Sequence, residues 1–391
     1  MDPTTEALLK KVETLGQQLA KDGSLKTKIE LQTAVRKLGI ELESEGDIAD
    51  RICYQPAGIV AIRIAVDLGI FEILAKSDAP KTTKELAKEV GAEYELLARI
   101  MRNLAAIDAV DEVGTEEYKA SKISRAFAQP KGISGAKFFI NFLYPMWINL
   151  PKNLAESSYR NPVNPMKCAA QIAHKDDRHV FQILMDQPQE FGNFLTFMSA
   201  QKEGRQGWLD FYPVEKQLIE GFKGEYVFVD VGGAGGHECH AIKGKYPQLP
   251  GKLVLQDLPD TIERVKGTEA PGMEAMVHDF FTPQPIKSAK AYYLRNVLHD
   301  WNTDSCIGIL KNITAVMEPG YSKILINETV VPLKGANLFT CQSDLNMMTS
   351  LAGMERTEDQ WQELCKAAGL KIEKIWGGEG DSESLIEAVL A

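Results

Sequence analysis

The most constraining feature of the sequence is an alternation of short apolar segments with longer, helix-like segments from residue 225 to the C-terminus. Such alternation is typical of strands that are joined through helices to parallel neighbours. It predicts an α/β fold in which helices cover both faces of a parallel sheet. The expected strands are YVFVDV (226–231), KLVLQD (252–257), MEAMVHD (273–279), KAYYLRN (290–296), SKILINE (322–328) and SLIEAVLA (384–391).

The sequence before residue 221 lacks the alternation of strand-like and helix-like segments, which indicates further domains. A chain of 391 residues is longer than one hydrophobic core usually supports. Residues 1–125 read as an N-terminal helical domain, in which residues 50–125 have short helices followed by the β-turn-β segment DEVGTEEYKAS, the order of a winged-helix unit. Thr82 and Glu85 have the spacing of a helix capping box. Residues 126–220 read as a helical linker region rich in aromatic and methionine side chains, which either pack in a core or line a pocket, and residues 221–391 read as a separate α/β domain.

The first two predicted helices, at about residues 5–20 and 29–42, present apolar stripes at helical spacing. Two interpretations remain open: the stripes pack on a partner subunit or on their own domain. A winged helix often binds DNA, but residues 93–102 mix glutamate with arginine and form no basic face. We therefore expect a structural role for this unit.

Composition narrows the functional classes. The formal net charge of -10 disfavours nucleic acid, which needs clustered lysine and arginine. The sequence has no apolar run of about 18 residues and no basic, apolar start typical of a signal peptide, so we expect a cytoplasmic protein that does not bind membranes. Six scattered cysteines without a CxxC pair favour free thiols and disfavour structural zinc.

The first predicted strand runs into VDVGGAGGHECHAI, where Gly232, Gly233 and Gly235 lie between strand and helix. A glycine turn at this edge of an α/β sheet is typical of a nucleotide site. The dinucleotide motif G-x-G-x-x-G fails in both registers and no phosphate-binding G-x-x-x-x-G-K-[ST] motif exists, which leaves an adenosine ligand without phosphate. His237 and His240 have an HxxH spacing but no visible third ligand cluster, so we predict no metal.

The next two strands also end in residues suited to a nucleoside. Asp257 and Leu258 follow the second strand, where a carboxylate can accept hydrogen bonds from both ribose hydroxyls. Asp279 and Phe280 follow the third strand and offer an acceptor and a ring for adenine. An isolated aspartate at a strand end is more often a helix cap, but three consecutive strand ends together favour one cleft.

The motifs VDVGGAGG, QDLPD, VHDFF, YYLRNVLHDW, ILINETVV and GMERTEDQWQELCKAAGL, in this order, resemble the S-adenosylmethionine-dependent O-methyltransferases of plants and fungi, the class II or caffeate-O-methyltransferase-like family. The fungal secondary-metabolite branch is the most similar. The resemblance covers residues from about 50 to the end and implies a Rossmann-like C-terminal domain with a mostly parallel seven-stranded sheet, and an N-terminal α-helical, winged-helix-like dimerisation domain. It implies a homodimer that uses S-adenosylmethionine, releases S-adenosylhomocysteine and needs no metal.

In this family the histidine of the LHDW motif is the general base, which corresponds to His299, and the flanking acids correspond to Glu328 and Glu355. A phenol of pKa ~10 is a poor nucleophile until it loses its proton, a task suited to a histidine. Carboxylates beside the ring fix its orientation and stabilise the imidazolium. The resemblance also implies a cofactor contact for Arg295, with a surface ion pair as the alternative, and we expect Asp300 to cap the following helix.

The resemblance places the acceptor among helices before the cofactor domain and the segment before GMERTE. These positions are rich in aromatic and methionine side chains, which suit a wide, flat phenolic polyketide or meroterpenoid. The expected acceptor residues are Phe191, Phe194, Met198, Trp208, Met347 and Met348.

Fungal relatives have become pericyclases that hold S-adenosylmethionine without transferring its methyl group, but in these a cationic residue tends to replace the histidine. This chain departs from the family pattern at Ala234, where a third consecutive glycine is usual.

Overall fold

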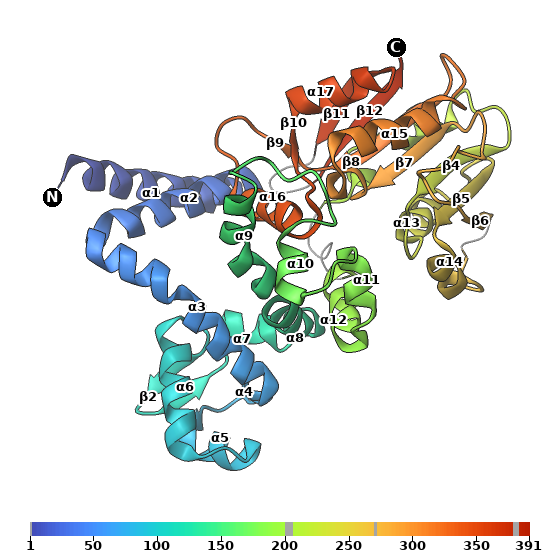
Figure 1. The fold of residues 1–391 in the computed structure, drawn as a ribbon. Coiled ribbons are helices and arrows are strands. Elements are labelled where there is room, and N and C mark those ends of the chain that lie inside the picture. Colours follow the sequence, from blue (N-terminus) through green and yellow to red (C-terminus); the bar gives the residue numbers. More distant parts are fainter. Residues whose placement is uncertain (1, 200–205, 270–271, 378–382) are drawn as a thin grey trace. The chain divides into compact units, whose positions relative to one another are not determined.

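The computed structural model describes residues 2–199, 206–269, 272–377 and 383–391 (Figure 1). It divides the chain into two compact units, Met1–Pro145 with Phe181–Glu203, and Met146–Val180 with Gly204–Ala391. The segment 126–220, predicted as one helical linker region, is therefore shared between the two units. Its residues 200–205 lie outside the described residues.

The first unit begins with two neighbouring helices, α1 (Pro3–Asp22) and α2 (Leu25–Leu42). Asp2 and Ser24 cap their N-termini, since each side chain accepts backbone N–H groups of the first turn. The two helices pack on each other, with Leu15 and Ala34 buried. Several apolar side chains nevertheless remain exposed, so contact with a partner subunit stays a prediction.

The next part of the first unit confirms the predicted winged-helix order. The Thr82 hydroxyl accepts the Glu85 N–H at 3.2 Å and the Glu85 carboxylate accepts the Thr82 N–H at 2.8 Å, which confirms the capping box. The wing forms an antiparallel sheet in the order β1-β3-β2. The elements are α3 (Glu45–Asp67), α4 (Ile70–Ala75), β1 (Lys81–Thr82), α5 (Thr83–Val90), α6 (Tyr94–Ala106), β2 (Asp111–Gly114), β3 (Glu117–Lys119) and α7 (Lys122–Phe127).

Helices form the rest of the first unit and the start of the second. In the first unit, α8 packs on α12, and a π-helical turn, Phe139–Leu143, follows α8 directly. Helix α9 begins at the boundary between the units. The elements are α8 (Pro130–Phe138), α9 (Tyr144–Glu156), α10 (Ala169–His174), α11 (Val180–Met185) and α12 (Pro188–Ser199), with two short helical turns at Trp208–Asp210 and Glu215–Ile219.

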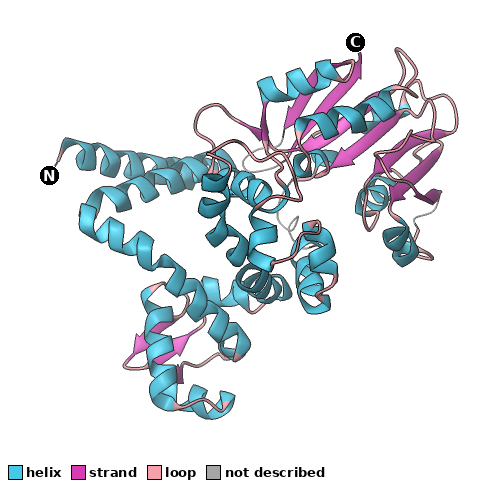
Figure 2. Ribbon diagram, viewed as in Figure 1, coloured by secondary structure: helices cyan, strands magenta, loops and turns pink. Residues whose placement is uncertain are grey.

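The second unit is built on a seven-stranded sheet in the order β11-β12-β8-β7-β4-β5-β6 (Figure 2). Neighbours among β8, β7, β4, β5 and β6 run parallel, whereas β12 runs antiparallel to β8 and β11 antiparallel to β12. This confirms the predicted α/β class and all six predicted strands. The strands are β4 (Tyr226–Val231), β5 (Lys252–Asp257), β6 (Met273–Val277), β7 (Ala291–Arg295), β8 (Lys323–Glu328), β11 (Leu370–Gly377) and β12 (Ser384–Leu390).

Helices cover both faces of this sheet. On one face, α15 (Thr303–Thr314) and α17 (Glu358–Ala367) bury Ile309, Trp361 and their neighbours against β4, β7 and β8. On the other face, α13 (His237–Lys245) and α14 (Pro259–Val265) pack against β4 and β5. None of the helices in the described ranges combines the length and apolar character that crossing a bilayer requires.

Candidate active site

The site forms where three segments meet at the carboxyl end of the central strands. Strand β7 ends at Arg295 and leads into a short 3-10 turn, Leu298–Asp300, which carries His299. Glu328 is the last residue of the neighbouring strand β8. Glu355 precedes the short strand β10 (Arg356–Thr357), which pairs with β9 (Val330–Val331) just beyond Glu328. The parallel order of the sheet therefore brings together residues that are 29 and 56 positions apart.

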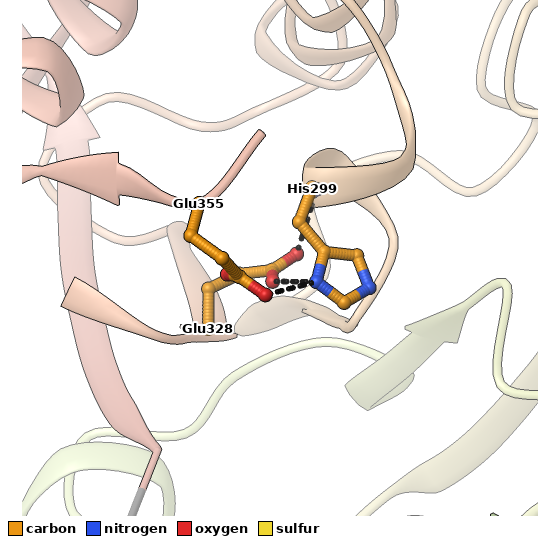
Figure 3. Close-up of side chains that lie close together, drawn as sticks. All are labelled: His299, Glu328 and Glu355. Carbon is orange, nitrogen blue, oxygen red and sulfur yellow. Dashed lines mark hydrogen bonds and ion pairs between the residues drawn. The ribbon is translucent and has the colours of Figure 1, made fainter. Parts of the chain in front are cut away.

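Both glutamates face the same nitrogen of the imidazole (Figure 3). The His299 Nδ1 atom lies 3.1 Å from Oε1 of Glu355 and 3.6 Å from Oε2 of Glu328. The other ring nitrogen, Nε2, points away from both glutamates and lies 3.4 Å from Oδ1 of Asp300. The glutamate side chains are almost fully buried, whereas the imidazole keeps 14% of its surface exposed. The ring is thus held at one edge and accessible elsewhere.

Glu328 also organises the backbone of the turn. Its Oε1 atom accepts the N–H groups of Val297 at 3.0 Å, Leu298 at 2.9 Å and His299 at 3.4 Å. These bonds fix a carboxylate that has no exposed surface. Such bonds favour the ionised form and compensate part of the cost of burying its charge.

Two residues of helix α16 (Leu338–Leu351), which the sequence interpretation missed, position Glu355. Its Oε1 atom accepts a hydrogen bond from the Ser343 hydroxyl at 2.9 Å, and its backbone N–H donates to Oδ1 of Asp344 at 2.8 Å. No local pattern indicates these contacts, because the chain returns to them only after the helix has ended. The sequence offered only the adjacent Ser343 and Asp344, 12 and 11 residues before Glu355, and nothing in their spacing points to this contact.

Burial and charge act on His299 in opposite directions. Burial lowers the pKa of the imidazole, but the negative charges of Glu328, Asp300 and Glu355 outweigh burial and raise the pKa above its ordinary value. Burial also raises the pKa of Glu328 and of Asp300, against the effect of the His299 charge. Burial would do the same to Glu355, but its hydrogen bond and charge interaction with His299 and its hydrogen bond with Ser343 hold that pKa below its ordinary value.

His299, Glu328 and Glu355 are also the one group of at least three His, Cys, Asp or Glu side chains in the described part of the chain whose geometry could hold a metal ion. Their candidate ligand atoms lie within 4.8 Å of one another. The oxygen of Glu328 on the turn side is already bound by backbone N–H groups, and that of Glu355 by Ser343. The other oxygen of each glutamate is buried without a hydrogen-bond partner among the described residues.

The predicted glycine turn lies between β4 and α13, and its glycines serve different purposes. Gly232 has a φ of +72°, which favours glycine, and a Cβ there would meet Val297 at 3.1 Å. At Gly233 a Cβ would lie 2.5 Å from the Asp230 carboxylate, so this glycine is required by the packing of the protein itself. At Gly235 a Cβ would approach the His237 ring at 3.1 Å.

The predicted strand-end residues frame this turn. Asp257 accepts the N–H of Ala234 at 2.9 Å and that of Leu258 at 2.7 Å, so it braces the turn in addition to its predicted ribose contact. Asp279 accepts the N–H of Phe281 at 3.0 Å. Leu258 and Phe281, a residue the sequence interpretation missed, leave 52% and 44% of their surfaces exposed.

These surroundings fit S-adenosylmethionine. Exposed apolar side chains beside carboxylates suit a flat base and its ribose hydroxyls, and the described part of the turn has no lysine or arginine of the kind that grips phosphate. Phe280 is half-buried and packs edge-on against Trp301, with ring centroids 6.0 Å apart. The contacts of the glycine turn, Asp257, Leu258, Asp279 and Phe280 with the cofactor stay predictions.

Two predicted roles need correction or restatement. Arg295 makes a bidentate ion pair with Glu383, both distances 2.7 Å, and lies 3.7 Å from Glu238, so the ion pair that the sequence left as an alternative is present and mostly buried. Its cofactor contact stays a prediction. Asp300 does not cap the following helix, because Asn302 accepts the Ser305 N–H at the start of α15. The Asp300 carboxylate turns to His299 instead.

The predicted acceptor residues are not all available to a ligand. Trp208 is buried, stacks on Phe228 and donates its indole N–H to Glu238 at 2.8 Å, so its prediction as a pocket residue is wrong: the ring completes the core. Met347 and Met348 are half-buried on α16 in the second unit. The remaining three, Phe191, Phe194 and Met198, lie on α12 in the first unit and are partly or largely exposed.

Comparisons with known proteins agree with this fold. Residues 197–371 match the O-methyltransferase domain and residues 58–130 match the O-methyltransferase dimerisation domain. The methyltransferase cfoC of Aspergillus candidus is 46% identical, with 99% of each chain covered. The demethylsterigmatocystin 6-O-methyltransferase of Aspergillus parasiticus is 35% identical, with 93% of each chain covered. The chain belongs to this family of fungal secondary-metabolite O-methyltransferases, and it is an S-adenosylmethionine-dependent enzyme.

Solved structures extend the comparison. LepI in complex with S-adenosylmethionine superimposes with a TM-score of 0.88 at 32% identity, over 99% of this chain and 100% of that chain. A structure described as a pericyclic reaction enzyme matches with the same TM-score, identity and coverage. OxaC in complex with S-adenosylhomocysteine and oxaline gives a TM-score of 0.88 at 27% identity, over 99% of each chain. The match to the dimerisation domain supports a homodimer.

Proposed function

We propose that this enzyme methylates a phenolic hydroxyl of a fungal polyketide or meroterpenoid, with His299 as the general base. The observation that carries the proposal is the imidazole whose Nδ1 faces two buried glutamates while Nε2 points away from them. The name of the relative from Aspergillus parasiticus describes methyl transfer to an oxygen of demethylsterigmatocystin, which supports a hydroxyl group of a fungal metabolite as the acceptor.

The charges around His299 suit this reaction. Proton transfer from a phenol of pKa ~10 to an ordinary histidine of pKa ~6.5 is uphill by several kcal/mol. Because the glutamates and Asp300 raise the pKa of His299, the imidazole becomes a stronger base and the two pKa values approach each other. Bound S-adenosylmethionine supplies an electrophilic methyl group, and the enzyme's part is to align the acceptor oxygen, remove its proton and hold the resulting imidazolium.

The direct test is the variant His299→Ala, assayed with methyl-labelled S-adenosylmethionine and a panel of phenolic metabolites. We expect the methylation rate to fall by about 10²- to 10⁴-fold, the usual contribution of a general base. Binding of S-adenosylhomocysteine, measured by calorimetry, should change little. A variant that methylates at the wild-type rate contradicts the general-base role. Addition of a chelator should leave the wild-type rate unchanged, which also tests the prediction that no metal is used.

A second candidate function is a pericyclic reaction on the same fold. The matching structure described as a pericyclic reaction enzyme favours it, as does the raised pKa of His299, since a cationic ring can polarise a carbonyl. Chromatography separates the two candidates. Methyl transfer forms one S-adenosylhomocysteine for each product, whereas a pericyclic reaction converts substrate without forming any.

A further inference from the structure

The backbone carbonyl groups of the turn that carries His299 are bound by one segment, Gly353–Arg356. Arg356 donates from Nη1 to the carbonyl of Leu298 at 2.9 Å and from Nη2 to that of Trp301 at 2.8 Å. Between these two bonds, the N–H of Met354 donates to the carbonyl of His299 at 2.9 Å. Glu328 binds the N–H groups of the same turn from the opposite side, so the turn is held through both its donors and its acceptors.

Gly353 allows this close approach. A Cβ at this position would lie 2.1 Å from the carbonyl oxygen of His299 and 3.0 Å from the carbonyl carbon of Asp300. Both atoms belong to backbone, which cannot move aside as a flexible side chain can. Any side chain at residue 353 would therefore push the turn, and His299 with it, away from Glu355.

The side chain of Arg356 is almost completely buried, with 1% of the residue exposed, and the groups that it contacts are uncharged. Besides the two carbonyl groups, they are the Cys306 sulfur at 3.4 Å and the Trp361 ring, whose centroid lies 5.4 Å away. Within the described residues no carboxylate lies at ion-pair distance from it. A buried charge of this kind is costly unless a nearby opposite charge compensates it.

Part of the compensating charge comes from the neighbouring Glu355 carboxylate. Arg356 directly follows Glu355, and its positive charge contributes to the lowered pKa of that carboxyl. One planar guanidinium can thus do two things that a lysine cannot do together: bind two carbonyl groups of the turn and carry a delocalised charge beside buried acids.

We propose that Arg356, with Gly353, is a positioning residue of the methyl transfer: it holds the 298–301 turn so that His299 stays in register with Glu328 and Glu355, and its positive charge stabilises the Glu355 carboxylate. This inference rests on the proposed role of His299 as the base. A purely structural arginine would contribute to stability alone. A positioning arginine also sets kcat and the protonation of His299.

The experiment compares Arg356→Lys, Arg356→Met and Gly353→Ala with two controls. Trp361→Phe perturbs the same core beside the guanidinium, and Arg63→Lys changes an arginine that pairs with Asp67 in the first unit. For each variant, kcat and KM are measured per folded protein over a range of pH, and the His299 ring is titrated by nuclear magnetic resonance. The His299→Asn variant identifies its signal among the six histidines.

We expect Arg356→Met to lower kcat about 100-fold and Arg356→Lys about 10-fold, with the KM for S-adenosylmethionine within about twofold, because displacement of a catalytic group by about 1 Å has effects of this size. Removing the positive charge should also raise the pKa of His299 in Arg356→Met, whereas Arg356→Lys keeps the charge and should show no such rise. Gly353→Ala should lower kcat in the same way as Arg356→Lys.

Several outcomes overturn the inference. Trp361→Phe should lower the stability without changing the pKa of His299. If Trp361→Phe and Arg356→Met shift this pKa equally, Arg356 has only a structural role in the core. If Arg356→Met does not fold, a wild-type kcat in Arg356→Lys and Gly353→Ala overturns the inference by itself. Failure of the proposed function is distinguishable, because then His299→Ala methylates normally, whereas failure of this inference leaves His299→Ala inactive and the Arg356 and Gly353 variants active.

Discussion

The chemistry of His299 depends on the difference between its two nitrogens. Glu355 lies 3.1 Å from Nδ1 and accepts a hydrogen bond from Ser343, so the imidazole is fixed at the edge that would not react in the proposed mechanism. Asp300 lies 3.4 Å from Nε2, where an acceptor hydroxyl would have to approach. In the proposed reaction the ring would exchange the Asp300 carboxylate for the acceptor hydroxyl at Nε2, while its contacts at Nδ1 persist.

The substitution Glu355→Gln tests this arrangement through pH. The base acts only when unprotonated, so kcat/KM rises with pH through the raised pKa of His299. Removing the negative charge at Nδ1 lowers that pKa, and the rising limb should move to lower pH by about one unit, while the plateau falls about 10-fold because the imidazolium loses a stabilising charge. Glu363→Gln, an exposed position on α17, is the control. A shift to higher pH would contradict this account.

At the scale of the element, the glycine turn contains one residue, Ala234, in an unfavourable backbone conformation. Ala234 has a φ of +49°, in the left-handed region that costs an alanine about 1 kcal/mol relative to glycine. Its N–H is bound by Asp257, so the turn is kept although the residue does not favour it. The substitution Ala234→Gly should therefore raise the melting temperature by about 1–3 °C.

The matched control for Ala234→Gly is Ala315→Gly. Ala315 is also exposed and in the same unit, but it has the right-handed conformation, with a φ of -61°, at the end of α15. At Ala315, glycine relieves no strain and only increases the conformational entropy of the unfolded chain, so the melting temperature of Ala315→Gly should fall. Thermal melts of both variants decide the matter. Equal shifts of the same sign would show that the conformation of Ala234 is not strained.

The sequence predicted the features that depend on neighbouring residues. The strands from β4 to β8, the glycine turn and the Thr82 capping box each have a local pattern, and the family resemblance placed His299, Glu328 and Glu355. Strand β11 was missed, because LKIEKIWG at the sheet edge alternates charged and apolar residues without a continuous apolar run. Such an edge strand is recognised only by its pairing with β12.

Contacts between residues far apart in the chain were not predicted from the sequence. Arg356 binds a carbonyl 58 positions away, and Ser343 reaches Glu355 across the end of a helix, so neither role has a local signature. Trp208 was assigned to the acceptor pocket by its position in the family resemblance. Periodicity does not distinguish a ring that faces a ligand from one that stacks in the core, as Trp208 does on Phe228.

At the scale of the whole molecule, the N-terminal helices α1 and α2 expose large apolar side chains that a single subunit does not bury. They precede residues 58–130, which match the dimerisation domain, yet α1 and α2 bury few of their apolar side chains. Repeated apolar exposure on adjoining helices is typical of an interface. The exposed apolar residues of these two helices are Leu9, Leu25, Val35, Ile40 and Leu42.

We therefore expect α1 and α2 to strengthen the homodimer. The double substitution Ile40→Glu with Leu42→Glu should raise the dimer dissociation constant about 10-fold or more, since each change places a charge where apolar surface would be buried. Light scattering over a dilution series measures this constant, and circular dichroism verifies that the helices persist. Leu333→Glu, at a residue of the second unit that is 81% exposed, should leave the constant unchanged. If the double variant dimerises as tightly as the wild type, these helices pack only within their own subunit, and residues 58–130 are sufficient for the dimer.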